Sequence, residues 1–237
     1  MERLDKIIAN RGIASRREVK ELVRQGRVLV DGVPASAPDV KVSAETVAIT
    51  VDGVPVSGER YTYLLLHKPA GVLTATEDKH QPTVMELLPE SLRRRGLAPV
   101  GRLDKDTEGL LLLTDDGELT HRLLSPKYHV DKVYYAQVDG VPDTTDAEAF
   151  AAGLLLEDGL QCLPAKLELL GGDACLVTLR EGKFHQVKRM LASRGKPVLY
   201  LKRLAMGPLT LEDTLPAGQC RPLTEEEISA LRCACGV

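Results

Sequence analysis

The feature that most constrains the fold is a polar loop that runs directly into a row of leucines. Residues 101–109 read Gly-Arg-Leu-Asp-Lys-Asp-Thr-Glu-Gly, and residues 110–114 read Leu-Leu-Leu-Leu-Thr. A short continuous apolar run of this kind indicates a strand buried in the core. Asp104 therefore lies on a loop that a buried strand braces, where a carboxylate is held still and is partly removed from water.

A carboxylate in such a place suits nucleophilic chemistry if it stays ionised. Burial disfavours the charged form, whereas a neighbouring cation favours it, and a carboxylate nucleophile must be ionised at neutral pH. The loop carries its own cation, Arg102, two residues before Asp104. The alternative is a surface Arg–Asp pair that precedes a strand, because most ion pairs are structural.

The run from Gly101 to Gly117 resembles the signature loop of pseudouridine synthases, in particular the branch named after the small-ribosomal-subunit enzyme RsuA. The family loop reads G-R-L-D-x-x-T-x-G-L-L-L-L-T-x-D-G, and every specified residue is present here. In that family the aspartate is the nucleophile. The resemblance therefore implies this role for Asp104, in an isomerase that converts uridine to pseudouridine in RNA.

Length and composition fit an intracellular enzyme with one large and one small domain. The chain has 237 residues, and a typical domain has roughly 150. No apolar run approaches the roughly 20 residues of a membrane span, and the start has no signal-peptide pattern, so we expect a cytoplasmic protein without membrane contact. The five cysteines lack paired spacing, which predicts reduced thiols and no metal site.

The first 58 residues are predicted to form a separate small module. Apolar residues at helical spacing over 4–8 indicate a first helix. Ser15 and Glu18 form a capping box that opens a second helix. Residues 28–33 then read as a strand, an Asp-Gly turn and a second strand, which is a hairpin signal.

This module is basic although the whole chain carries a net charge of −3. Charge polarised in this way steers one face toward phosphates. The run from Ser15 to Gly32 resembles the S4 RNA-binding domain, whose pattern is S-R-R-E-x-x-x-L-[IV]-x-x-G-x-V-x-V-[ND]-G. A solvated helical hairpin with ordinary surface charge is the alternative. The resemblance implies phosphate contacts by Arg16, Arg17, Lys20, Arg24 and Arg27.

A second domain is predicted over residues 61–233, beginning with an apolar strand at 63–66. A further strand is predicted over 132–138, and helix caps are predicted at Thr83, Thr145 and Thr224, each with an acidic residue three positions later. Strands and helices do not alternate regularly. We therefore expect an α+β protein, in which the small S4-like domain is followed by a mixed, mainly antiparallel sheet with the pseudouridine synthase fold.

Two segments complete the candidate site on one side. Residues 132–134 resemble the family's K-x-Y strand, which implies that Tyr134 contacts the target base and Lys132 the RNA. An aromatic ring suits this position because a base removed from its stack loses stacking energy. Tyr135 is the alternative but points to the opposite face of a strand, and either tyrosine fits an ordinary core. Residues 200–203 resemble a segment that presents an apolar residue, here Leu201, to the flipped base.

On the other side, residues 181–190 resemble the family's E-G-[KR]-x-H-Q-V-[KR]-R-M turn and helix. Helical spacing places Lys188 at the edge of the apolar face, within reach of a carboxylate, and points Arg189 toward solvent or phosphate. Pairing with the nucleophilic aspartate is the role of the family's counterpart of Lys188. RNA contacts are implied for His185 and Gln186. A basic amphipathic helix without a special partner is the alternative.

The predicted mechanism uses these residues without a cofactor or a metal. Asp104 attacks a flipped uridine at the base or the sugar, the glycosidic bond breaks, and the uracil rotates and is rejoined through C5. Lys188 and Arg102 hold Asp104 or the RNA backbone, and Tyr134 packs on the base. The reaction changes no redox state and transfers no group, and no P-loop or dinucleotide-binding glycine pattern occurs.

The expected partner is ribosomal RNA, either free or in a small-subunit assembly particle, and the protein is expected to be a monomer. The resemblance implies uridine 516 of the 16S rRNA as the target, and the compact tail after residues 221–227 favours the small-subunit branch. One alternative is the same reaction on 23S rRNA. The other is a non-catalytic ribosome-assembly factor, against which the intact Asp104, Tyr134 and Lys188 positions argue.

Overall fold

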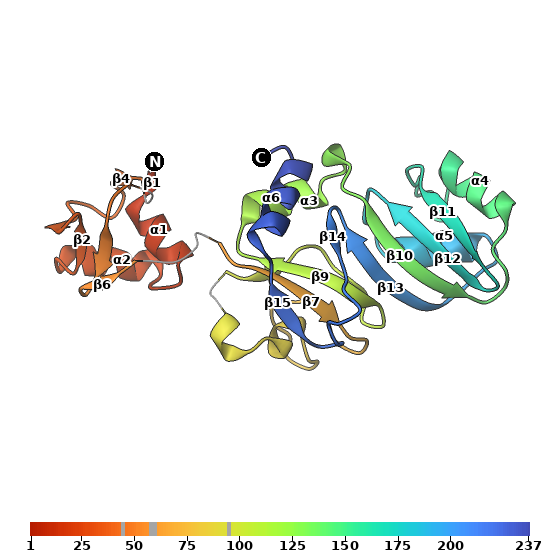
Figure 1. The fold of residues 1–237 in the computed structure, drawn as a ribbon, viewed down its shortest axis with the longest axis horizontal. Coiled ribbons are helices and arrows are strands. Elements are labelled where there is room, and N and C mark those ends of the chain that lie inside the picture. Colours follow the sequence, from red (N-terminus) through yellow and green to blue (C-terminus); the bar gives the residue numbers. More distant parts are fainter. Residues whose placement is uncertain (44–45, 57–60, 94–95) are drawn as a thin grey trace. The chain divides into compact units, whose positions relative to one another are not determined.

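The computed structural model describes residues 1–43, 46–56, 61–93 and 96–237 (Figure 1). The chain divides into two compact units, residues 1–62 with 93–97, and residues 63–92 with 98–237. The domain boundary predicted near residue 58 lies outside the described residues. In the described parts of the chain, no helix has the length and apolarity needed to cross a membrane.

The first unit packs two helices against a small antiparallel sheet of order β3-β2-β5-β6. The predicted capping box of Ser15 and Glu18 is confirmed, and so is the hairpin turn, where Asp31 and Gly32 both have positive φ. A separate antiparallel pair joins β1, which precedes α1, to β4, which lies between β3 and β5 in the chain. The bounds are β1 Glu2–Arg3, α1 Leu4–Asn10, α2 Arg16–Arg24, β2 Val28–Val30, β3 Val33–Pro34, β4 Lys41–Val42, β5 Ile49–Val51 and β6 Val54–Pro55.

The second unit is built on a sheet with the strand path β11-β12-β10-β13-β9-β7-β15, to which β14 and β8 add at β13 and β9. Every described pair is antiparallel except β9 with β13, which is parallel. The predicted α+β class with a mixed, mainly antiparallel sheet is confirmed. The bounds are β7 Tyr63–Lys68, β8 Ala98–Pro99, β9 Glu108–Thr114, β10 Lys132–Val138, β11 Lys166–Gly171, β12 Ala174–Leu179, β13 Val198–Met206, β14 Leu209–Thr210 and β15 Cys220–Pro222.

The helices lie at the two ends of this sheet and on one face (Figure 1). Helices α3 and α6 lie side by side, where Arg122 donates to the carbonyl of Cys235, and α4 packs on β11 at the opposite end. The bounds are η1 Val84–Leu87, η2 Glu90–Leu92, α3 Gly117–Leu124, η3 Pro126–Tyr128, α4 Thr144–Ala152, α5 Gln186–Ser193 and α6 Glu225–Ala234.

Two of the three predicted caps in this unit are confirmed. Thr224 caps α6, and Thr83 caps the short 3-10 helix η1. The cap predicted at Thr145 is wrong, because α4 begins at Thr144 and its cap is Asp143, two residues before Thr145. The Asp143 carboxylate accepts hydrogen bonds from the backbone of Thr145 and Asp146, and a carboxylate at this position also favours the positive end of the helix dipole.

The predicted leucine strand is the centre of the core. Leu110, Leu111, Leu112 and Leu113 on β9 are completely buried, and they pair with β7 across an antiparallel ladder. On its other edge β9 pairs in parallel with β13, and this pairing begins where Glu108 lies opposite Lys202. The loop that carries Asp104 therefore ends where the two parts of the sheet meet.

Candidate active site

A pocket opens where the 102–107 loop, β10, β13 and the turn before α5 converge. It contains most of the residues that the sequence singled out in the second domain, brought together from segments that lie up to about a hundred residues apart. The lining residues are Arg102, Leu103, Asp104, Thr107, Tyr134, Leu179, Gly182, Lys183, His185, Gln186, Val187, Lys188 and Leu201.

Asp104 lies in this pocket with two cationic or titratable partners. The Lys188 ammonium is 3.2 Å from one carboxylate oxygen, and the His185 Nε2 atom is 3.5 Å from the other. Lys188 also bridges to Asp106, at 2.6 Å. Burial lowers the pKa of Lys188, but hydrogen bonds to Asp106 and Asp104 outweigh it and raise that pKa above its usual value. The ammonium is therefore charged at neutral pH, and its hydrogen bond lowers the pKa of Asp106.

Arg102 does not supply this charge, contrary to one of its two predicted roles. It lines the pocket with its side chain exposed, and among the described residues it makes no ion pair with Asp104. The remaining predicted role, a contact with the RNA backbone, agrees with a free guanidinium at the mouth of the pocket.

The loop around Asp104 is held by a residue that the sequence analysis missed. Lys68 is completely buried, and its ammonium donates to the carbonyl oxygens of Lys105 and Thr107 at 3.2 and 2.8 Å. Burial lowers its pKa to about 8. The Thr74 hydroxyl donates to the Leu103 carbonyl at 2.7 Å, so the loop is braced from both sides. The signal in the sequence that could have identified Lys68 is its position two residues after the apolar run 63–66.

Tyr134 and Leu201 form the apolar wall of the pocket. They lie on the adjacent strands β10 and β13, and both are more than nine-tenths buried. Tyr135 has the opposite orientation and packs edge-on against Tyr200, with ring centroids 6.2 Å apart. Of the two tyrosines, Tyr134 lines the pocket and Tyr135 does not, as strand alternation predicts for residues on opposite faces.

Three of the side chains predicted to contact RNA have partners within the protein. Lys132 is buried on the same face of β10 as Tyr134, and its ammonium donates to the Val130 carbonyl; burial lowers its pKa to about 8. Gln186 is also buried, because its side chain closes the turn by bonding Glu181 and the Lys183 backbone.

The third is Arg189. Its guanidinium pairs with Asp158 at 2.5 Å and lies outside the pocket. The prediction that it points away from the apolar helix face is consistent with this position. Its partner comes from a distant loop, which helical spacing cannot reveal, and the Arg189 side chain remains 28% exposed.

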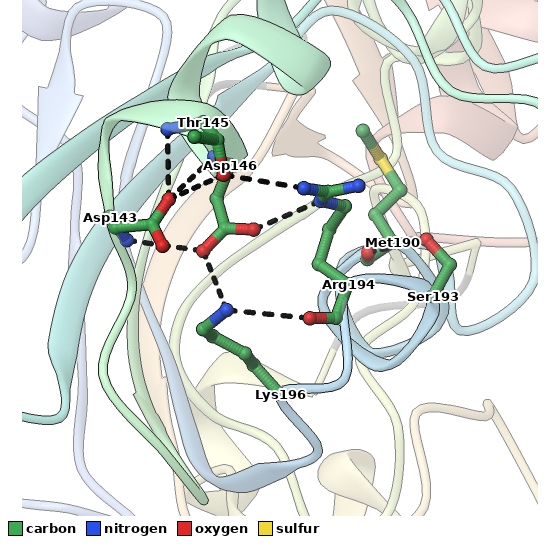
Figure 2. A network of polar contacts seen from close by, with 7 residues as sticks. All are labelled: Asp143, Thr145, Asp146, Met190, Ser193, Arg194 and Lys196. Carbon is green, nitrogen blue, oxygen red and sulfur yellow. Dashed lines mark hydrogen bonds and ion pairs between the residues drawn. The ribbon is translucent and has the colours of Figure 1, made fainter.

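A buried ionic network fixes the far end of the helix that carries Lys188 (Figure 2). The Asp146 carboxylate on α4 accepts from Arg194 at 2.9 Å and from Lys196 at 2.8 Å, just after α5 ends. Burial raises the pKa of Asp146, but its hydrogen bonds from Lys196, Asp143 and Arg194 outweigh this and hold it below its usual value. This network restricts the position of α5 relative to α4.

The first unit has a separate cationic pocket, lined by Arg3, Asp5, Arg16, Arg17 and Lys20. The Asp5 carboxylate is buried and accepts from both Arg3 and Arg16, so it holds two guanidinium groups at fixed positions. Neither Arg3 nor Asp5 was singled out from the sequence, because a buried acid between two basic side chains has no local signal.

The remaining basic residues predicted in this unit are already paired. Arg24 pairs with Glu21 on the same helix, and Arg27 forms two bonds to Asp52, at 2.6 and 2.7 Å. A guanidinium with a bidentate carboxylate partner is less available to phosphate. The predicted phosphate contacts are therefore better supported for Arg17 and Lys20 than for Arg24 and Arg27, and Arg16 is likewise paired, with Asp5.

Comparison with known proteins identifies the class of enzyme. The model of the family described as RNA pseudouridylate synthase matches residues 62–193, and that of the S4 domain matches residues 2–47. The chain belongs to the RNA pseudouridine synthase family, and it is an isomerase that acts on RNA. This finding argues against the non-catalytic assembly factor.

Relatives match over nearly their whole length. The uncharacterized RNA pseudouridine synthase YtzG of Bacillus subtilis is 47% identical, over 97% of this chain and 98% of the relative. Ribosomal small subunit pseudouridine synthase A of Pseudomonas aeruginosa is 40% identical, over 97% and 100%. A solved pseudouridylate synthase is similar with a TM-score of 0.69 and 36% identity, over 98% of this chain and 100% of that one.

Proposed function

We propose that the protein converts one uridine of the small-subunit ribosomal RNA to pseudouridine, with Asp104 as the nucleophile. The observation that carries the proposal is the pocket in which Asp104 meets Lys188 on one side and Tyr134 with Leu201 on the other. A base taken out of its helix needs both an apolar or aromatic wall and a positioned polar group. This pocket offers both.

In the proposed reaction Asp104 attacks the flipped nucleotide at the base or the sugar. The C1′–N1 bond breaks, the uracil turns within the pocket, and C5 becomes joined to C1′. The proton on C5 is released to water, while N1 gains one. Lys188 orients Asp104 through their ion pair, Tyr134 packs on the base, and Leu201 excludes water from it. Arg102 and His185, at the mouth of the pocket, contact the adjoining RNA.

The choice of ribosomal subunit is supported by relatives with specific names. Those of Pseudomonas aeruginosa, Vibrio cholerae and Salmonella typhimurium are named ribosomal small subunit pseudouridine synthase A. A Bacillus subtilis relative named ribosomal large subunit pseudouridine synthase B is equally similar, at 40% identity over 98% of this chain. The large-subunit RNA is therefore the second candidate substrate.

Mapping separates the two substrates. In rRNA from a strain that lacks this protein, we expect mass analysis to find one pseudouridine missing from the small-subunit rRNA and restored by the wild-type gene. Loss of a pseudouridine only from the large-subunit rRNA would move the reaction to that RNA. The same comparison on isolated rRNA and on assembly particles identifies the preferred form of the substrate.

We further propose that the first unit binds RNA phosphates through the pocket around Asp5, and that the protein acts as a monomer in the cytoplasm. Each phosphate contact contributes to the salt dependence of RNA affinity. We expect Arg17→Ala to weaken rRNA binding and to reduce the slope of log affinity against log salt by about one. Binding measured over a series of salt concentrations tests this.

Arg27→Ala is the matched control, because Arg27 is also an exposed arginine of the first unit but is already paired with Asp52. We expect it to change the slope much less than Arg17→Ala does. Equal slopes for wild type and Arg17→Ala would contradict the assignment of phosphate binding to this pocket.

A further inference from the structure

Phe184 is an exposed aromatic side chain in a protein that has very few aromatic residues. The chain contains two phenylalanines. Phe150 is completely buried, whereas Phe184 is 68% exposed. Leaving a large apolar ring in water is unfavourable, and a phenylalanine normally contributes to the core. Its position in a turn that is otherwise polar therefore requires a reason other than packing.

The ring is held in a defined orientation beside the active site. It stacks on the His185 ring, with centroids 3.8 Å apart and planes inclined by 20°. His185 has a left-handed backbone conformation, with φ of 48°, and its Nε2 atom lies 3.5 Å from Asp104. Lys183 and His185 line the pocket, while Phe184 does not. The two stacked rings thus extend from the pocket to the surface next to it.

We propose that the exposed face of Phe184 is a stacking platform for a nucleobase adjacent to the target uridine. The inference rests on the proposed position of that uridine in the Asp104 pocket. Removing one base from a helix exposes faces of its neighbours, and single-stranded or unstacked bases are commonly bound on Phe and His rings. A stack that continues from His185 to Phe184 to the base replaces part of the lost stacking energy.

The surroundings of Phe184 favour RNA over a protein partner. Lys183 and Arg102 are exposed beside the same pocket, and the neighbouring Gly182 carries no side chain. A protein interface is marked by a larger contiguous apolar patch, whereas a single ring flanked by cations matches the combination of stacking and phosphate binding that single-stranded RNA needs. Stacking is also tolerant of sequence, so the platform would position the substrate rather than select a particular base.

Steady-state kinetics of tritium release from C5 test the proposal, with the RNA in which mapping finds the pseudouridine. Loss of one base–aromatic stack corresponds to about five- to 150-fold in affinity. We expect Phe184→Ala to raise KM within that range and to change kcat much less, and we expect Phe184→Tyr to restore KM because it keeps the ring. Val141→Ala is the control, since Val141 is similarly exposed, at 65%, and we expect it to match wild type.

A fluorescent base identifies the stacked nucleotide. With 2-aminopurine placed on either side of the target uridine, wild type and Phe184→Tyr should quench one position on binding, and Phe184→Ala should not. Unchanged KM in Phe184→Ala, or quenching identical to wild type at both positions, would overturn the platform. These outcomes differ from failure of the proposed mechanism, which would appear as a fully active Asp104→Asn enzyme with Phe184 intact.

Discussion

Replacing Asp104 with asparagine should abolish pseudouridine formation while leaving the protein folded. Asparagine has nearly the same shape as aspartate, but its amide is not a nucleophile at neutral pH. Lys188 retains Asp106 as a partner, at 2.6 Å, so the helix that carries it should stay in place. We expect tritium release to fall by at least about a thousandfold, with RNA affinity and the circular dichroism spectrum close to those of wild type.

Asp106→Asn is the control for this variant, because both carboxylates pair with Lys188. Asp106 is the more exposed of the two, with a side chain 77% accessible against 25% for Asp104, and it does not line the pocket. The hydrogen bond from Lys188 lowers the pKa of Asp106, so Asp106→Asn removes one negative charge outside the pocket, and we expect it to reduce activity much less than Asp104→Asn does. An inactive Asp106→Asn enzyme beside an active Asp104→Asn enzyme would reverse the proposed roles.

Gly109→Ala should cause a large loss of stability, although it adds a single methyl group. Gly109 begins the parallel pairing of β9 with β13, opposite Arg203. A Cβ at this position would overlap the backbone carbonyl of Arg203, and Gly109 has a φ of +111°, which side chains with a Cβ rarely adopt. We expect the free energy of unfolding to fall by more than about 4 kcal/mol. Urea denaturation followed by circular dichroism measures the change.

Gly117→Ala provides the comparison. Gly117 is exposed at the first turn of α3, and a Cβ there meets no atom within 4 Å. Because alanine favours the helix over glycine by roughly 0.5–1 kcal/mol, we expect this variant to be as stable as wild type or slightly more stable. A Gly109→Ala protein that unfolds at the same urea concentration as Gly117→Ala would show that the β9–β13 junction tolerates a wider separation.

Local features were predictable because neighbours in the sequence create them. The capping boxes at Ser15 and Thr224 and the Asp31-Gly32 turn depend on backbone groups within a few residues, and all three occur in the structure. The failure at Thr145 has a local cause as well. Two candidate caps lie two residues apart, and the aspartate, which binds two backbone N–H groups, is the better one.

The partners of charged side chains were not predictable in the same way. Strand alternation places Lys132 and Tyr134 on the same face of β10. It does not reveal that this face is buried at Lys132. Arg27 and Asp52 are 25 positions apart, and Arg189 and Asp158 are 31 positions apart; each pair meets only because loops fold back. The sequence predicted RNA contacts for Lys132, Arg27 and Arg189. In the structure each of these side chains has a hydrogen-bond or ion-pair partner within the protein.

The sequence by itself determined the family, the α+β class and the identity of the aspartate in the signature loop, since these depend on residue types at fixed spacing along one segment. Only the tertiary structure decided which cation accompanies Asp104, because Lys188 lies 84 residues away and reaches it through the packing of α5 near β13. It also decided the role of Lys68, whose buried ammonium finds its acceptors on the loop beyond the next strand. Each position of the sequence specifies which chemical group is present, but which groups come close together depends on how the strands and helices of the whole domain pack.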